Sequence, residues 1–131
     1  MTPRLRNLVL FPFVSALLMM AAIVEAPAGE APILVKGKFQ TPVSLEGVVA
    51  DWTARGYSDW SSSWKEKGWS SERAYFKNCV RAVLAGRMEY IIDGQRFVLE
   101  PGDELFYPAN TMQTARNLSD GVSKMLVATT P

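Results

Sequence analysis

The sequence predicts an all-β fold, an antiparallel sandwich or small barrel. Short runs rich in β-branched and aromatic residues follow one another at regular intervals between residues 86 and 117. Turn residues separate these runs, and Asp93-Gly94 is the strongest hairpin signal because a two-residue type I′ turn needs positive φ at both central positions. The strands expected here are Met88–Ile92, Gln95–Leu99, Leu105–Tyr107 and Met112–Asn117.

The stretch before residue 86 predicts further strands with less regular spacing. Val43–Ala50 is expected to be a strand with a possible bulge at Gly47, and Tyr57–Trp60 could be another. Ser61–Gly68 has the composition of a charged loop. Cys79–Ala85 is expected to be a strand that is apolar on both faces.

Four tryptophans are concentrated in one short segment, at positions 52, 60, 64 and 69. They could form a stacking platform for a sugar or another flat ligand. We favour the interpretation that they close one end of the β core, because large aromatic side chains contribute most to small cores.

Composition excludes several classes of function. The chain has 131 residues, 48% of them apolar, which suits one small domain. Its 14 basic and 13 acidic residues give a net charge of +1, so no basic surface for nucleic acid is expected. The single cysteine permits no intrachain disulfide. The absence of histidine removes the commonest transition-metal ligand and the commonest general base.

The N-terminus has the three-part pattern of a secretory signal peptide. Arg4 and Arg6 precede the uncharged run Leu8–Val24, and Ala26-Pro27-Ala28 offers small residues for cleavage. The run is shorter than the roughly 20 residues that a membrane span needs, although an uncleaved anchor is the alternative. We therefore expect a signal peptide over 1–28, a tether or edge strand over 29–50, a barrel over 51–131, and an exported mature protein, periplasmic or secreted, without membrane contact.

The segment from Gly102 has a specific spacing. Gly102 is followed after five residues by Pro108-Ala109-Asn110, then after two residues by Gln113, and after three more by Asn117. This resembles the second motif of the cupin superfamily. Asn110 stands where the family has Gly, and asparagine tolerates the positive φ expected there. Gln113 stands where the family has its metal-binding histidine.

The first cupin motif is matched by distance alone. Counting back from Gly86, the motif's glutamate falls on Cys79, its second histidine on Tyr75 or Ala74, and its first on Arg73 or Glu72. The resemblance covers about residues 51–128 and implies a jelly-roll barrel with a cavity. A subgroup of single-domain cupins begins with a stretch similar to residues 51–56, and Trp69 could take the place of a Trp that precedes the first motif there.

The candidate ligand cavity follows from this resemblance and from strand alternation. If Cys79 faces inward, so do Arg81, Val83 and Ala85. Because Tyr75, Cys79 and Gln113 are a poor ligand set for transition metals, we expect no metal and no cofactor. A buried Arg81 must be paired, either with an anionic ligand or with Glu89 or Glu104. The alternative is a register shifted by one residue, which would turn Arg81 to solvent. The expected cavity residues are Tyr75, Cys79, Arg81, Tyr90 and Gln113.

Three functions remain open from the sequence. The first is a non-catalytic domain that binds a small organic molecule, possibly an anion. The second is a metal-independent isomerase or lyase that uses Tyr75, Cys79 or Glu104 for proton transfer. The third is an interaction module that supports an oligomer, and a homodimer is expected because both faces of Cys79–Ala85 need cover.

Overall fold

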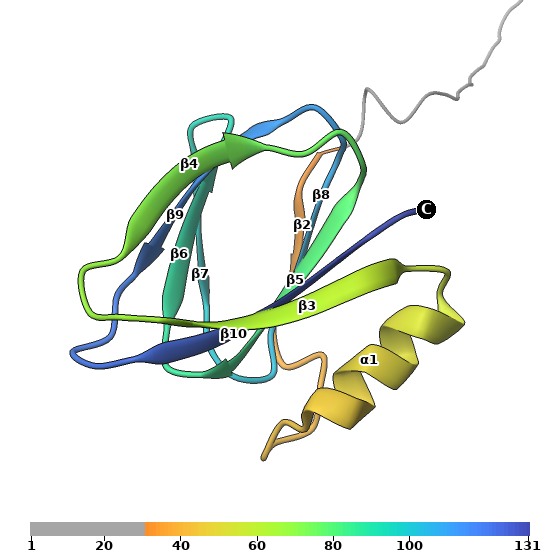
Figure 1. Ribbon diagram of the computed structural model, residues 1–131, viewed down its shortest axis with the longest axis horizontal. Helices are drawn as coiled ribbons and strands as arrows, with labels where there is room; N and C mark the ends of the chain where they lie inside the picture. Colours follow the sequence, from red (N-terminus) through yellow and green to blue (C-terminus); the bar gives the residue numbers. More distant parts are fainter. Residues whose placement is uncertain (1–30) are drawn as a thin grey trace, which may run out of the picture. The chain divides into compact units, whose positions relative to one another are not determined.

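Two antiparallel β-sheets face each other in the computed structural model, which describes residues 31–131 (Figure 1). The larger sheet has the strand order β2-β8-β5-β10-β3, and the smaller has the order β4-β9-β6-β7. The larger sheet comprises β2 (Ile33–Val35), β3 (Ser58–Lys65), β5 (Cys79–Ala85), β8 (Glu104–Tyr107) and β10 (Ser123–Thr129). The smaller comprises β4 (Ser70–Ala74), β6 (Met88–Ile92), β7 (Gln95–Leu99) and β9 (Met112–Asn117).

The predicted all-β class is confirmed, and the strands from β5 to β9 agree with the sequence. Only β8 differs, since it begins one residue earlier, at Glu104. Asp93 and Gly94 adopt φ values of 50° and 77°, as the predicted type I′ turn requires. Asn110 has a φ of 60°, which explains how asparagine replaces glycine at that turn.

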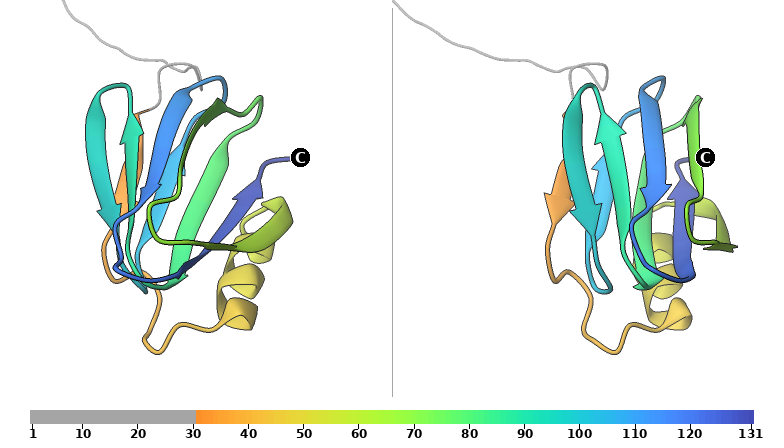
Figure 2. Two further views of the ribbon diagram at one scale, coloured as in Figure 1. Left: turned by 60° about the vertical axis from the view of Figure 1, so that its left-hand side comes forward. Right: turned by 90° about the vertical axis from the view of Figure 1, so that its left-hand side faces the viewer.

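One helix, α1 (Leu45–Ala54), occupies most of the segment that we expected to be a strand, and that prediction is wrong. The helix begins at a cap, because the Ser44 side chain accepts a hydrogen bond from the Gly47 amide at 3.0 Å. Val48 and Trp52, four residues apart, lie on one buried face. Figure 2 shows α1 on the outside of the sandwich, beside β3 and β10.

The loop expected over Ser61–Gly68 is also wrong in its first half, which belongs to β3. This strand pairs with β10 in antiparallel register, with Ser62 opposite Leu126. Its alternate residues Trp60 and Trp64 are 46% and 61% exposed, so these two tryptophans do not close the core. Trp52, a residue of α1, is fully buried, but it packs between the helix and the larger sheet in a second core.

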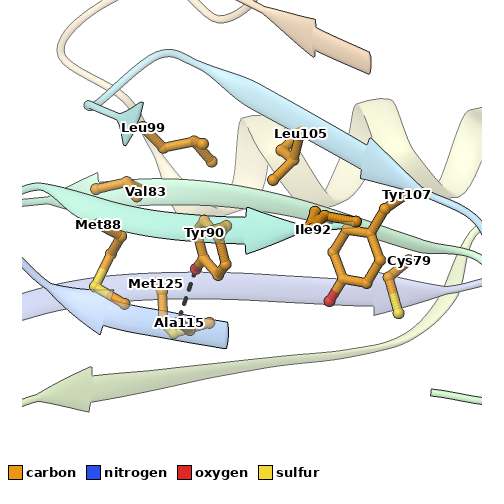
Figure 3. Packing of buried hydrophobic residues seen from close by; sticks show 10 residues of the cluster. All are labelled: Cys79, Val83, Met88, Tyr90, Ile92, Leu99, Leu105, Tyr107, Ala115 and Met125. Carbon is orange, nitrogen blue, oxygen red and sulfur yellow. Dashed lines mark hydrogen bonds between the residues drawn. The ribbon is translucent and has the colours of Figure 1, made fainter. Parts of the chain in front are cut away.

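The apolar residues of β5 divide between two cores, as strand alternation predicts. Cys79 and Val83 point between the sheets, where they join the main cluster shown in Figure 3. Val80 and Ala82 point the other way and pack against α1. Each face of this strand is therefore covered within the described residues.

The N-terminal expectations fall only partly on described residues. The expected signal segment 1–28 lies outside them, and the boundary expected between residues 50 and 51 falls inside α1. β2 lies within the segment for which a tether or edge strand was expected, and it pairs with β8. Between residues 31 and 131, no helix is long and apolar enough to span a membrane.

Candidate functional site

A cavity of about 120 Å³ lies between β3, β4, β5, β9 and β10. Three of its lining side chains are cationic, Lys65, Arg73 and Arg81, and none is acidic. The remaining lining residues are small, apolar or neutral. They are Ser61, Ser63, Trp69, Ser71, Tyr75, Gln113, Ala115, Met125 and Val127.

Arg81 is the deepest cation, because only 3% of its surface is exposed. Its Nε donates to the Tyr107 hydroxyl and its Nη2 to the Tyr75 hydroxyl, each at 3.0 Å. Nη1 has a 4.0 Å contact with the Met125 sulfur. A guanidinium has five N–H donors, so these contacts leave part of its donor capacity free.

Tyrosine rings surround the Arg81 charge. The guanidinium carbon lies 5.3 Å from the centroid of the Tyr75 ring, 5.4 Å from that of Tyr90 and 5.9 Å from that of Tyr107. Burial raises the pKa of Tyr90 and of Tyr107 more than the neighbouring Arg81 charge lowers it, so both phenols stay neutral. The cation is thus held by ring faces and neutral hydroxyls.

The other two cations lie closer to solvent. Lys65 Nζ lies 4.3 Å from the Trp69 ring centroid, and the Arg73 guanidinium carbon lies 4.7 Å from that of Tyr75. Burial lowers the pKa of Lys65, and the positive charges of Arg81 and Arg73 lower it further. The three cations therefore lie close enough to affect one another, although burial is the larger cause of the shift.

None of these three cations forms an ion pair with a carboxylate among residues 31–131. Other basic residues of the domain do so, including Lys36 with Asp103 and Arg116 with Glu89. The ion pair that we considered between Arg81 and Glu89 or Glu104 is therefore not formed. Glu89 pairs instead with Arg96 and Arg116 on the outer face of the smaller sheet.

Gln113 contributes a buried acceptor that has no donor. The residue is 1% exposed, and its Oε1 has no hydrogen-bond partner within the described residues. Gln113 lies directly opposite Arg73 in the β4–β9 register, so their side chains share the inner face. A buried acceptor without a donor carries an uncompensated desolvation cost.

The five expected cavity residues occupy two depths. Tyr75, Arg81 and Gln113 line the cavity. Cys79 and Tyr90 lie beneath it in the core, where Tyr90 contacts the Met125 sulfur at 3.7 Å (Figure 3). Burial raises the pKa of the Cys79 thiol more than the Arg81 charge lowers it.

Glu104 does not face the cavity, contrary to the role considered for it in proton transfer. It lies opposite Ala82, on the β5 face that packs against α1. Its carboxylate accepts from the Trp52 indole at 2.7 Å and also pairs with Arg55. Glu104 therefore joins the helix to the sheet. Of the three side chains considered for proton transfer, only Tyr75 lines the cavity.

The donor set does not fit the metal that the cupin resemblance implies. The ligand positions carry Arg73, Tyr75, Cys79 and Gln113, and Arg81 adds a second positive charge beside them. Among residues 31–131, no group of three or more His, Cys, Asp and Glu side chains could hold a metal ion. A cation would meet repulsion here and too few anionic or imidazole donors.

Sequence reasoning missed the contribution of β3 to the cavity. Ser61, Ser63 and Lys65 line it from alternate positions, while Trp60 and Trp64 point outward. The period-two alternation of these residues was the available signal.

A larger hollow of about 320 Å³ lies elsewhere, lined by residues 39–44, 47 and 48, and it has no charged lining residue.

A family model and a solved structure both relate this chain to cupins. The model of a cupin domain matches residues 79–129. No relative was found among curated proteins.

Solved structures agree with the fold. A cupin superfamily protein from Desulfitobacterium hafniense DCB-2 is 31% identical, with a TM-score of 0.50, over 56% of this chain and 69% of that one. A DUF861 family protein from Thermotoga maritima is 15% identical, with a TM-score of 0.52, over 76% and 99%. Acireductone dioxygenase from Bacillus anthracis, solved with a cadmium ion in its active centre, is 16% identical, with a TM-score of 0.51, over 66% and 58%. This chain belongs to the cupin superfamily.

Proposed function

We propose that the domain binds a small organic anion, a short carboxylate, in the cavity lined by Lys65, Arg73 and Arg81. The observation that carries this proposal is the convergence of three cations without a carboxylate partner among residues 31–131. A buried charge is costly unless it is paired, and a bound carboxylate would pair it. Arginine is suited to this task because its planar donors match a carboxylate.

The cavity volume limits the size of the ligand. Drug-sized ligands occupy pockets of about 300–1,000 Å³, and this cavity holds about 120 Å³. A molecule of a few heavy atoms therefore fits. The apolar wall of Ala115, Met125 and Val127 suits a short carbon chain behind the carboxylate.

Titration calorimetry with propionate at fixed ionic strength tests the proposal. We expect a dissociation constant below about 1 mM, since five heavy atoms at high ligand efficiency can supply the roughly 4 kcal/mol required. Arg73→Gln removes one exposed cation and should weaken binding about tenfold, as loss of a charged hydrogen bond does. Lys38→Gln is the matched control, because Lys38 is exposed and does not line the cavity.

Arg81→Met provides a second, deeper test. It keeps most of the side-chain volume and removes the charge, so a folded variant should lose propionate binding. Absence of binding to the parent protein at tens of millimolar propionate would overturn the proposal. So would an equal loss of affinity in Arg73→Gln and Lys38→Gln, because the effect would then be one of net charge.

We further propose that the mature protein is exported after removal of residues 1–28. Support comes from Arg4 and Arg6 before the apolar run Leu8–Val24. Mass spectrometry of the protein from its native host should find a chain that begins near Gly29. An intact N-terminal segment in the membrane fraction would indicate an anchor instead.

A second candidate function is an interaction module that forms a homodimer through β3. This strand is an edge of the larger sheet, and its exposed Trp60 and Trp64 support the proposal. Light scattering should then give twice the monomer mass, and Trp64→Ser should shift it to the monomer. Val122→Ser, at another exposed apolar side chain, is the control. A monomeric parent would contradict the proposal.

A further inference from the structure

We infer that the preferred ligand is an α-hydroxy carboxylate, whose hydroxyl donates to Gln113 Oε1. This inference rests on the proposed carboxylate site and adds a second, independent requirement to it. The requirement is set by an acceptor that is fully buried at the cavity and has no donor in residues 31–131. A ligand that brings a donor would satisfy it.

The sheet register places the cation that would bind the carboxylate next to the acceptor that would bind the hydroxyl. Arg73 on β4 and Gln113 on β9 are directly opposite residues of one antiparallel pair. Such residues have Cβ atoms about 4.5–5.5 Å apart. A carboxylate held near Arg73 would therefore place a substituent on its neighbouring carbon within reach of Gln113.

Charge decides which kind of donor fits. An ammonium group would also donate to Gln113, but it would enter a cavity with three positive charges and no acidic lining residue. Like charges at close range are unfavourable, and burial makes this worse. A hydroxyl supplies the donor without a charge, so a hydroxy acid fits better than an amino acid.

Three probes of the same charge and carbon number test this inference by calorimetry: propionate, lactate and pyruvate. We expect lactate to bind about tenfold more tightly than propionate, because only lactate satisfies the Gln113 acceptor. Pyruvate should bind no more tightly than propionate, because its keto oxygen would face the Gln113 oxygen. Failure of all three to bind would contradict the carboxylate site itself.

Gln113→Met is the decisive variant, because methionine has a similar length and no acceptor of comparable strength. The preference for lactate over propionate should disappear while propionate binding remains. Without ligand, the variant should unfold at the same or a higher urea concentration than the parent, since an unsatisfied buried acceptor is removed.

Three outcomes would overturn the inference and leave the carboxylate site standing. The first is equal binding of lactate and propionate. The second is a preference for pyruvate, which would mean that Gln113 offers its NH₂ group to the ligand. The third is a preference for lactate that survives Gln113→Met.

Discussion

The Trp52 indole Nε1 donates a 2.7 Å hydrogen bond to Glu104 Oε1, and this bond joins α1 to β8. Arg55 pairs with the same carboxylate and also with Asp51 at 2.7 Å. The helix is thus attached to the sheet both by apolar burial and by a satisfied polar contact. This relationship also removes Glu104 from the cavity.

Glu104→Ala should lower the free energy of unfolding by about 2–4 kcal/mol, because it leaves the buried Trp52 N–H without an acceptor. Glu104→Gln keeps an acceptor oxygen and should cost about 1 kcal/mol. Urea unfolding followed by tryptophan fluorescence measures both. Equal losses would show that the charge on Glu104, and not the acceptor for Trp52, carries the stabilisation.

Glu89 should make stability depend on pH in the acid range. The hydrogen bond from Arg96 lowers the pKa of Glu89 more than burial raises it, and the Arg116 charge lowers it further. A folded pKa below the unfolded value of about 4.3 stabilises the protein above that value, and the stabilisation is lost as pH falls through the folded pKa.

Glu89→Gln should therefore cost about 1 kcal/mol at neutral pH and progressively less below about pH 4. Urea midpoints measured from about pH 7 to about pH 3 give both curves. Glu72→Gln is the control, because Glu72 is exposed and has no ion pair in the described domain. Parallel curves for Glu89→Gln and the parent protein would contradict the prediction.

The stability of the protein should depend on the amide group of Asn117, and a side chain of the same shape without the NH₂ group should not replace it. Nδ2 donates to the carbonyls of Lys65, Glu66 and Gly121 at 2.9–3.0 Å, and Oδ1 accepts from Ser123 Oγ at 2.7 Å. The isosteric Asn117→Asp would place a carboxylate against three carbonyls. We expect a loss of about 3 kcal/mol in urea unfolding.

Asn78→Asp is the matched control for that variant. Asn78 uses its Oδ1 to accept from the Ala109 amide at 2.8 Å, a role that aspartate also performs. Its cost should stay within about 1 kcal/mol. Similar losses for the two variants would mean that the added charge, not the lost donor, destabilises the protein.

Local signals explain which strands could be predicted. The strands around Asp93-Gly94 have alternating apolar residues between turns whose φ requirements are visible in the sequence. The segment 43–50 has an apolar, β-branched composition as well. Its residues 45–50 are nevertheless helical, because Ser44 caps the helix and because Val48 and Trp52 pack against β5 and β10, which lie far away in the sequence.

The residues of the candidate site could be predicted where the strands that carry them could be predicted. Arg81 and Gln113 follow from strand alternation and from the spacing resemblance, and both line the cavity. Lys65 was missed because β3 is polar and forms by pairing with β10, about 60 residues later. The orphaned Gln113 acceptor could not be foreseen, since it depends on what every neighbouring side chain bonds to.

Gly86 should not tolerate a side chain. It adopts a φ of 85°, and a Cβ atom there would lie 2.1 Å from Ser123 Oγ. The Ser123 hydroxyl is held in place, because it accepts from the Arg87 amide at 3.0 Å and donates to Asn117 Oδ1 at 2.7 Å. Gly86→Ala should cost about 2–4 kcal/mol in urea unfolding. Gly121→Ala, where nothing lies within 4 Å, should change stability by less than about 1 kcal/mol.

Cys79 should be unreactive in the folded protein. Its side chain is fully buried, its Sγ contacts the Lys77 carbonyl at 3.6 Å, and burial raises the pKa of the thiol. A nucleophilic cysteine needs the opposite, a low pKa and access to solvent. We expect an aromatic disulfide reagent at neutral pH to modify the native protein at least about 100-fold more slowly than the urea-unfolded chain, because reaction requires opening of the core.

A reporter thiol calibrates this measurement. Ser62→Cys in a Cys79→Ala background places one thiol at an exposed position of β3, where it should react at the same rate in the folded and unfolded states. Rapid modification of native Cys79 would contradict the burial argument and would favour the alternative in which this residue takes part in catalysis. Slow modification that becomes fast only in urea assigns Cys79 to the core, where it packs as a small apolar side chain beside Tyr107.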